Sequence, residues 1–350
     1  MAIRVLIVDD SAFVRRLLTD ILSLDPDIEV VGAATNPIIA RDMIKALDPD
    51  VLTLDVEMPR MDGLAFLEKI MSLRPMPVVM ISSLTQKGTD IAIKALEMGA
   101  VDVIAKPVSG LADGFASLME EIVTKVKAAA NARVRPAKVE PVQRLASSAS
   151  FRTSERIIAI GASTGGVEAL QQVLTALPSD SPAVLVTQHM PAAFTASFAA
   201  RLNQCCAVTV CQARDGERVL PGHVYIAPGG LHLELARDGT NYICSVYDAP
   251  LVGGHKPSVD VLFRSVARKA GSGAVGVILT GMGKDGAAGL LQMREAGAFT
   301  IGQDETTSVV YGMPKAASEI GATEIELPIH KIAGHMLSKC EQIVSRAARV

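Results

Sequence analysis

Arg156-Ile-Ile-Ala-Ile-Gly-Ala-Ser-Thr-Gly-Gly-Val167 is the stretch that indicates the fold of the second half of this sequence. An apolar run stops at Gly161, presents Ser163, and resumes after Gly165-Gly166 with helical spacing. We therefore expect a buried strand, a tight turn and a helix, with the serine hydroxyl raised out of the sheet at the turn. The spacing Gly161-x-Ser163-x-Gly165 satisfies the pattern of a nucleophile elbow.

The same stretch has a second interpretation. A glycine-rich turn before a helix also cradles phosphate in nucleotide-binding folds, and the local sequence does not decide between the two. A nucleotide-dependent transferase or reductase would use Gly161–Gly166 in that way. The run Gly281-Met-Gly-Lys284 is not a P-loop, because the glycine spacing is missing and Asp285 follows the lysine in place of Ser or Thr.

Length and composition limit the class of protein. A chain of 350 residues is too long for one core and suits two domains. The net charge of −3 argues against a nucleic-acid partner, and no basic recognition helix is apparent. Five cysteines without a C-x-x-C pair indicate reduced thiols. Because there is no signal peptide and no apolar run of about 18 residues, we expect a cytoplasmic protein without membrane insertion.

Residues 1–125 alternate strand-like apolar runs with amphipathic helical stretches. Five such βα units predict an α/β domain with a parallel, doubly wound sheet. The expected strands are Val5–Val8, Glu29–Ala33, Val51–Leu54, Val78–Ser82 and Val101–Ala105. In residues 126–153 the pattern dissolves into Ala, Ser and Pro, which predicts an interdomain linker that begins as a helix.

Residues 154–350 form a second α/β domain, predicted to be doubly wound with a largely parallel sheet. The expected strands are Ile157–Ile160, Ala183–Val186, Val224–Ile226, Val275–Leu279 and Thr300–Gln303. The expected helices are Glu168–Leu177, Ser258–Ala270, Ala287–Ala296 and Ile332–Val344. The segment Val208–Tyr247 is predicted to contain a β-hairpin because it is richer in Gly, Val and Tyr.

Charged and polar residues follow the strands of the first domain. Asp9 and Asp10 end the first strand, Asp55 the third, Ser82 the fourth and Lys106 the fifth. In a doubly wound sheet these strand ends face one side, so the groups should converge. Three carboxylates suit Mg²⁺, and Asp55 would then attack a phosphoryl group while Lys106 and Ser82 bind its oxygens.

Three polar residues follow strands of the second domain. If these strands are neighbours, Ser163 would be a nucleophile, His189 its general base and Asp285 the group that orients the imidazole. Backbone donors in the glycine-rich loops would stabilise an oxyanion. We expect Thr164, Gly165 and Met282 beside the oxyanion or the substrate, and no cofactor for this chemistry.

Each of these residues also has a structural alternative. His189 is equally consistent with a structural histidine at a strand end, and Asp285 with the N-cap of the helix that follows it. Asp260 is a weaker rival for the carboxylate because it falls at an expected helix start. His255 lies in a polar run and is placed to approach the site.

The first 125 residues resemble the receiver domain of a two-component response regulator, including Asp55-Val-Glu-Met-Pro-Arg-Met-Asp-Gly63. The resemblance implies that Asp55 is the phosphoacceptor, Asp9 and Asp10 are Mg²⁺ ligands together with it, Ser82 is the switch hydroxyl and Lys106 contacts phosphate. Val103 stands where many receivers have an aromatic residue, so we do not expect an aromatic rotamer switch.

The order Ser…His…Asp departs from that of α/β-hydrolases. With Thr187-Gln-His-Met-Pro191, Ile278-Leu-Thr-Gly-Met-Gly-Lys-Asp-Gly-Ala287, Pro257-Ser-Val-Asp-Val-Leu-Phe263 and Tyr311-Gly-Met-Pro314, the whole chain resembles the chemotaxis protein-glutamate methylesterase family. The resemblance implies a phosphorylation-activated Ser-His-Asp hydrolase. It would demethylate glutamate methyl esters and deamidate glutamines on chemoreceptors, provide adaptation, and take its phosphate from the chemotaxis histidine kinase. Lys284 stands where many members have Asn.

Overall fold

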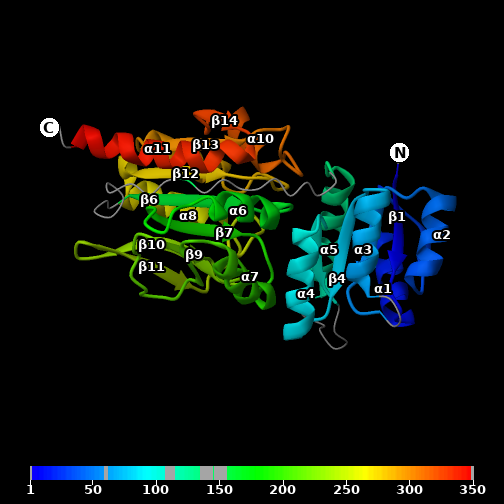
Figure 1. Cartoon of the computed structure of the whole chain (residues 1–350). Helices are drawn as coiled ribbons and strands as arrows, with labels where there is room; N and C mark the ends of the chain where they lie inside the picture. The colour runs from blue at the N-terminus through cyan, green and yellow to red at the C-terminus, as the bar shows by residue number, and fades with distance from the viewer. Residues whose placement is uncertain (1, 59–61, 107–114, 135–144, 146–155, 348–350) are drawn as a thin grey trace. The chain divides into compact units, whose positions relative to one another are not determined.

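The computed structural model describes residues 2–58, 62–106, 115–134, 145 and 156–347, with the side chains of 115–117 and 343–347 left aside. It divides into two compact units, Met1–Val139 and Glu140–Val350 (Figure 1). Most of the predicted linker lies outside the described residues, so the predicted domain limits stay a prediction. None of the described helices is both long and apolar enough to cross a membrane.

The first unit contains a parallel five-stranded sheet in the order β2-β1-β3-β4-β5 (Figure 1). This confirms the predicted doubly wound α/β fold. The strands are β1 (Ile3–Val8), β2 (Ile28–Ala34), β3 (Val51–Asp55), β4 (Val78–Ser82) and β5 (Asp102–Ala105), and the helices are α1 (Ala12–Leu22), α2 (Pro37–Leu47), α3 (Gly63–Leu73), α4 (Gln86–Glu97) and α5 (Phe115–Ala130). The side chains of Ser11, Asn36, Asp62 and Thr85 accept hydrogen bonds from the first turns of α1 to α4, which fixes where each helix begins.

The second unit contains a seven-stranded parallel sheet in the order β14-β13-β12-β6-β7-β9-β8 and a two-stranded antiparallel sheet, β10-β11. The strands are β6 (Ile157–Ala162), β7 (Ala183–Gln188), β8 (Thr209–Gln212), β9 (His223–Ile226), β10 (His232–Asp238), β11 (Asn241–Tyr247), β12 (Ala274–Ile278), β13 (Phe299–Gln303) and β14 (Ile325–Leu327). The helices are α6 (Gly166–Thr175), α7 (Ala192–Cys205), α8 (Val259–Lys269), α9 (Ala287–Glu295), α10 (Met313–Glu319) and α11 (Ile329–Ala347), with the short 3₁₀ helix η1 (Gly271–Gly273).

The predicted hairpin within Val208–Tyr247 is confirmed as β10-β11, but β8 and β9 in the same segment join the parallel sheet instead. The predicted end of a strand at Ile160 is wrong, since β6 continues through Gly161 to Ala162. A β-carbon at Gly161 would lie 2.2 Å from Val259 Cγ1 of α8. This glycine therefore permits close packing of a helix on the strand and does not break it.

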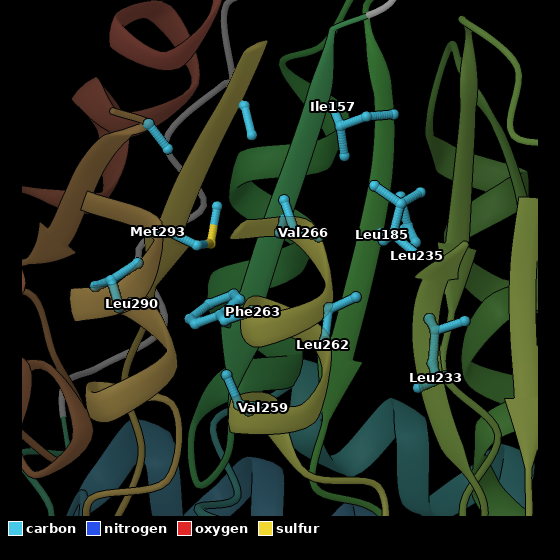
Figure 2. Close-up of a cluster of buried hydrophobic side chains, with 14 of the residues drawn as sticks. Ile157, Leu185, Leu233, Leu235, Val259, Leu262, Phe263, Val266, Leu290 and Met293 are labelled. Carbon is cyan, nitrogen blue, oxygen red and sulfur yellow. The ribbon is translucent and has the colours of Figure 1, made fainter. Parts of the chain in front are cut away.

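Helix α8 lies at the centre of the buried core of this unit (Figure 2). Its fully buried Phe263 packs in one cluster with Leu290 and Met293 of α9 and with Leu185 of β7. Leu233 of β10 belongs to the same cluster, so the hairpin contributes to the core as well as the parallel sheet. The position of α8 is consequently fixed from several sides.

The substitution Phe263→Ala should lower the free energy of unfolding of the C-terminal unit by about 3–5 kcal/mol, because it leaves a cavity at the centre of the core. Urea unfolding followed by circular dichroism measures this loss. Leu251→Ala removes a side chain that is 60% exposed and is the control. A loss at position 263 no larger than the one at position 251 would contradict the packing described above.

Candidate active site and phosphoacceptor site

Ser163 sits in a tight turn between β6 and α6. Its backbone N–H donates to Thr280 O at 3.0 Å, and its carbonyl accepts from Gly166 N at 2.7 Å. Gly165 adopts φ +77°, and a β-carbon there would lie 2.5 Å from Val309 Cβ. The turn therefore requires glycine at this position, which accounts for the sequence pattern around the serine.

The order of the strands brings the predicted residues together. Strand β6 lies between β12 and β7, so the direction of the crossover connections reverses at β6. Functional groups gather at such a point, beyond the carboxyl ends of the strands. Ser163, His189 and Asp285 follow β6, β7 and β12, and His189 N donates to Ala162 O at 3.1 Å.

Asp285 is the most strongly bound of these side chains. Its Oδ2 lies 2.8 Å from His189 Nε2 and accepts from Val259 N at 2.7 Å. Its Oδ1 accepts from Ser258 Oγ at 2.8 Å and from Asp260 N at 3.1 Å. Burial on its own raises the pKa of Asp285, but His189 and the two backbone N–H groups outweigh it and lower the pKa to about 2. The carboxylate thus stays ionised at neutral pH.

The interpretation of Asp285 as the N-cap of the helix that follows it is wrong. Gly286 is the N-cap of α9, and Asp285 instead accepts from the first turn of α8. In return, Asp260 of α8 accepts from Gly289 N of α9 at 2.7 Å. Each helix is capped by a carboxylate that belongs to the other segment, so Asp260 is occupied by α9 and by its ion pair with Arg264.

Asp285 contacts Nε2 of His189. The other ring nitrogen, Nδ1, is buried and has no hydrogen-bond partner in the part of the chain that the structure describes. The hydroxyl of Ser163 makes no hydrogen bond within the described residues either. In the familiar serine-protease arrangement the carboxylate holds Nδ1 and the serine faces Nε2. Here Nδ1 is the nitrogen that remains available to exchange a proton.

Backbone donors lie beside Ser163. Among the described residues, no acceptor takes the N–H groups of Gly165 or Met282. The loop that carries Met282 is fixed, because Gly281 N donates to Val310 O at 3.0 Å and Gly281 O accepts from Met313 N at 2.7 Å. Thr164 is buried, and its carbonyl accepts from Thr280 Oγ1 at 3.0 Å. Gly165 and Met282 therefore offer the kind of donors that an oxyanion requires.

Two glutamines that the sequence analysis did not identify support this site. Buried Gln188 donates through Nε2 to Ser163 O at 2.9 Å and to His189 O at 3.1 Å. Gln303 accepts from Thr280 N through Oε1 at 2.8 Å. The only signal that the sequence offers for Gln188 is its place directly before the histidine. For Ser258 the sequence indicates only a helix start.

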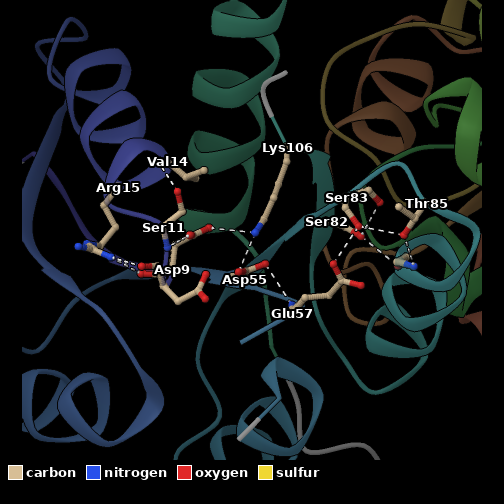
Figure 3. A network of polar contacts seen from close by, with 12 residues as sticks. Asp9, Ser11, Val14, Arg15, Asp55, Glu57, Ser82, Ser83, Thr85 and Lys106 are labelled. Atoms are coloured by element: carbon tan, nitrogen blue, oxygen red, sulfur yellow. Dashed lines mark hydrogen bonds and ion pairs between the residues drawn. The ribbon is translucent and has the colours of Figure 1, made fainter. Parts of the chain in front are cut away.

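The acidic residues Asp9 and Asp55 of the first unit lie close to Lys106 at the ends of their strands (Figure 3). The ligand atoms of Asp9, Asp10 and Asp55 lie within 4.8 Å of one another. Lys106 Nζ lies 2.7 Å from Asp55 Oδ2 and 3.6 Å from Asp9 Oδ2. Burial, with the charge of Asp9, raises the pKa of Asp55 to about 6 despite the hydrogen bond from Lys106.

Within the described residues, the hydroxyl of Ser82 makes no hydrogen bond to Asp55. It donates to Gly88 O of α4 at 2.9 Å, and the hydroxyl of Ser83 donates to Glu57. Pro59 to Met61 and Pro107, which belong to the receiver-like motifs, lie outside the described residues. Among the described residues, the buried Asp9 Oδ2 accepts no hydrogen bond and has only its longer ion pair with Lys106. This carboxylate set therefore fits a hard divalent cation such as Mg²⁺.

The family model described as CheB methylesterase matches residues 158–336 of the chain. The chain belongs to this family. The model described as response regulator receiver domain matches residues 5–112. The chain thus joins a receiver domain to a methylesterase catalytic domain.

Relatives with the same domain arrangement match nearly the whole chain. The protein-glutamate methylesterase/protein-glutamine glutaminase of Yersinia pestis bv. Antiqua is 56% identical over 337 residues, which is 96% of this chain and 97% of that protein. A protein of the same name from Paraburkholderia xenovorans is 53% identical and covers 99% of both chains. The crystal structure of the Thermotoga maritima CheB methylesterase catalytic domain is similar with a TM-score of 0.52 and 39% identity, over 53% of this chain and 99% of that one.

Because the pKa of Asp285 is lowered, we expect the free energy of unfolding to depend on pH in the acid range. A carboxylate whose pKa falls on folding contributes stability above its unfolded pKa and loses it as the pH drops through its folded pKa. Near neutral pH, the free energy of unfolding of the wild type should therefore be about 2 kcal/mol higher than that of Asp285→Asn. Urea unfolding at a series of pH values should show this difference disappear between pH 4 and about 2. Asp238→Asn, at the exposed end of β10, is the control. A gap that does not depend on pH would contradict the assignment.

Proposed function

We propose that this chain hydrolyses γ-glutamyl methyl esters, and deamidates glutamines, on chemoreceptors through Ser163, His189 and Asp285. The observation that carries the proposal is the contact between His189 and Asp285 beside the Ser163 turn. The names of the relatives supply the reaction, since they are protein-glutamate methylesterases and protein-glutamine glutaminases. Removal of methyl groups resets a chemoreceptor and so provides adaptation.

The chemistry follows from the free atoms of the site. Ser163 Oγ attacks the side-chain carbonyl carbon of the substrate and passes its proton to His189 Nδ1. The imidazolium then returns this proton to the leaving group, which departs as methanol from the ester or as ammonia from the amide. Water attacks the acyl-enzyme, His189 takes up its proton, and glutamate is released as Ser163 recovers its hydrogen.

The other groups have supporting roles in this scheme. Asp285 stays ionised, with a pKa of about 2, and so holds the imidazole and balances its transient charge. The N–H groups of Gly165 and Met282 would hold the oxyanion, with Thr164 beside it. The loss of one such donor typically lowers the rate by ~10²-fold or more.

We further propose that phosphorylation of Asp55 activates the hydrolase. Asp55 would attack the phosphorus of a phosphodonor, for which we propose the chemotaxis histidine kinase. The bond between the phosphorus and the donor atom breaks, and the donor leaves. With this donor, the protein would act in the cytoplasm. Asp9, Asp10 and Asp55 would hold Mg²⁺, which neutralises charge on the phosphoryl oxygens. Lys106 would exchange its ion pair with Asp55 for one with the phosphoryl group. The hydroxyl of Ser82 would have to give up its hydrogen bond to Gly88 O in order to bind a phosphoryl oxygen.

Ser163→Ala should lower the release of methanol from methyl-labelled receptor membranes by roughly 10⁴-fold or more, because no hydroxyl remains to form the acyl-enzyme. Ser179→Ala changes an exposed serine before β7, at the opposite edge of the sheet, and should be fully active. Circular dichroism and melting temperatures verify that both variants fold. If Ser163→Ala retains activity, and nucleotide raises the melting temperature, the glycine-rich turn binds phosphate and the proposal fails.

Asp55→Asn should keep the basal esterase rate and lose only the response to acetyl phosphate, because the amide cannot accept a phosphoryl group. Chelation of Mg²⁺ should remove the same response from the wild type. Asp42→Asn, an exposed carboxylate on α2, should respond like the wild type. Activation of Asp55→Asn by acetyl phosphate would show that another residue is the phosphoacceptor.

A further inference from the structure

His255 is placed directly over the proposed general base. The rings of His255 and His189 are stacked, with centroids 3.9 Å apart and planes 9° from parallel. The ring nitrogens of His255 make no hydrogen bond within the described residues. Its contact with the site is therefore made through the face of the ring. Neither the triad nor the oxyanion donors use this side chain.

The loop that carries His255 is fixed at both ends by one residue. Buried His232 of β10 donates through Nε2 to Pro250 O at 3.0 Å and accepts from Ser258 N through Nδ1 at 3.3 Å. Between these points Val252 and His255 exchange two backbone hydrogen bonds of 3.1 and 3.0 Å. The ring of His255 is thus positioned before any substrate arrives.

The glycines between Val252 and His255 make this arrangement possible. Gly253 and Gly254 have φ of +60° and +84°, the backbone of a two-residue hairpin turn in which both central residues are left-handed. A β-carbon at either position would meet nothing within 4 Å. The glycines are therefore needed for the backbone conformation of the turn and not for close packing against another segment. The turn positions the residue that follows it, His255.

His255 is uncharged at neutral pH, which suits a ring that stacks on an imidazole that becomes positively charged. Burial lowers the pKa of His255 to about 4, with a further lowering by His189 and an opposing effect of Asp285. The nearby cation Lys256 is paired with Asp248 at 2.7 Å. At neutral pH the ring is uncharged, and the face of an uncharged aromatic ring attracts a cation.

We propose that His255 is a positioning residue whose ring face holds the imidazole of His189 against Asp285 and stabilises the positive charge that His189 gains when Ser163 attacks. This inference rests on the proposed function. Charge appears on His189 only after substrate is bound, so the stack acts on turnover and not on substrate binding. It also covers one face of the imidazole against water, which strengthens its bond with Asp285.

The test compares three substitutions in the full chain, with receptor membranes of known methyl ester content as substrate. His255→Phe keeps an aromatic face and should retain kcat within about 2-fold, whereas His255→Leu should lower kcat about 10-fold with KM unchanged. His255→Lys places a second cation near the imidazolium and should be slower than His255→Leu. His223→Leu, at the start of β9, is the control and should match the wild type.

Melting temperatures of all variants separate loss of folding from loss of turnover. Equal kcat values for the Phe and Leu variants, or a change confined to KM, would overturn the stacking role. A Phe variant as slow as Ser163→Ala would also overturn it, because His255 would then take part in proton transfer itself. Ser163→Ala, measured in the same assay, tests the proposed function separately. If it is inactive while ring identity at position 255 has no effect, only this inference fails.

Discussion

The carboxylate of Asp285 holds together three segments that lie far apart in the sequence. It joins the loop after β12 to the imidazole after β7 and to the first turn of α8 through four hydrogen bonds. Helix α8 in turn lies at the centre of the hydrophobic core, since its Phe263 packs against both α9 and the sheet. The geometry of the proposed active site and the packing of the catalytic domain therefore depend on the same anchor.

The two proposed sites shift the pKa of a buried aspartate in opposite directions. Asp55 and Asp285 are both buried aspartates, and burial on its own raises the pKa of each. Asp285 is surrounded by donors and its pKa falls to about 2, whereas Asp55 shares a site with Asp9 and its pKa rises to about 6. The first arrangement keeps a permanent anion beside an imidazole. The second keeps carboxylates close together, which suits a cation and a phosphoryl group.

The convergence of Ser163, His189 and Asp285 was predictable because residues that follow neighbouring parallel strands must meet at one sheet edge. The same reasoning predicted the acidic site. The role of Asp285 at α8 was not predictable, because it depends on how α8 and α9 pack and not on their local sequences. The supporting role of Gln188 was not predictable for a similar reason. Its side chain donates to backbone carbonyls, and a sequence motif gives no information on such partners. The need for glycine at position 161 was not predictable either, because it comes from the close packing of Val259, a residue nearly a hundred positions away.

The reciprocal capping of α8 and α9 also bears on how such a domain evolves. Polar groups that serve chemistry usually weaken a fold, so that selection for heat resistance tends to erode activity. Asp285 reverses this relation, because the carboxylate that contacts His189 also satisfies two backbone donors of the neighbouring helix. A lineage that no longer needed the reaction would still be held to an acidic residue at position 285 by the demands of folding alone. An aspartate at that position in a distant homologue is accordingly no evidence of enzymatic activity, whereas the serine would be free to drift, since its hydroxyl makes no hydrogen bond within the described residues.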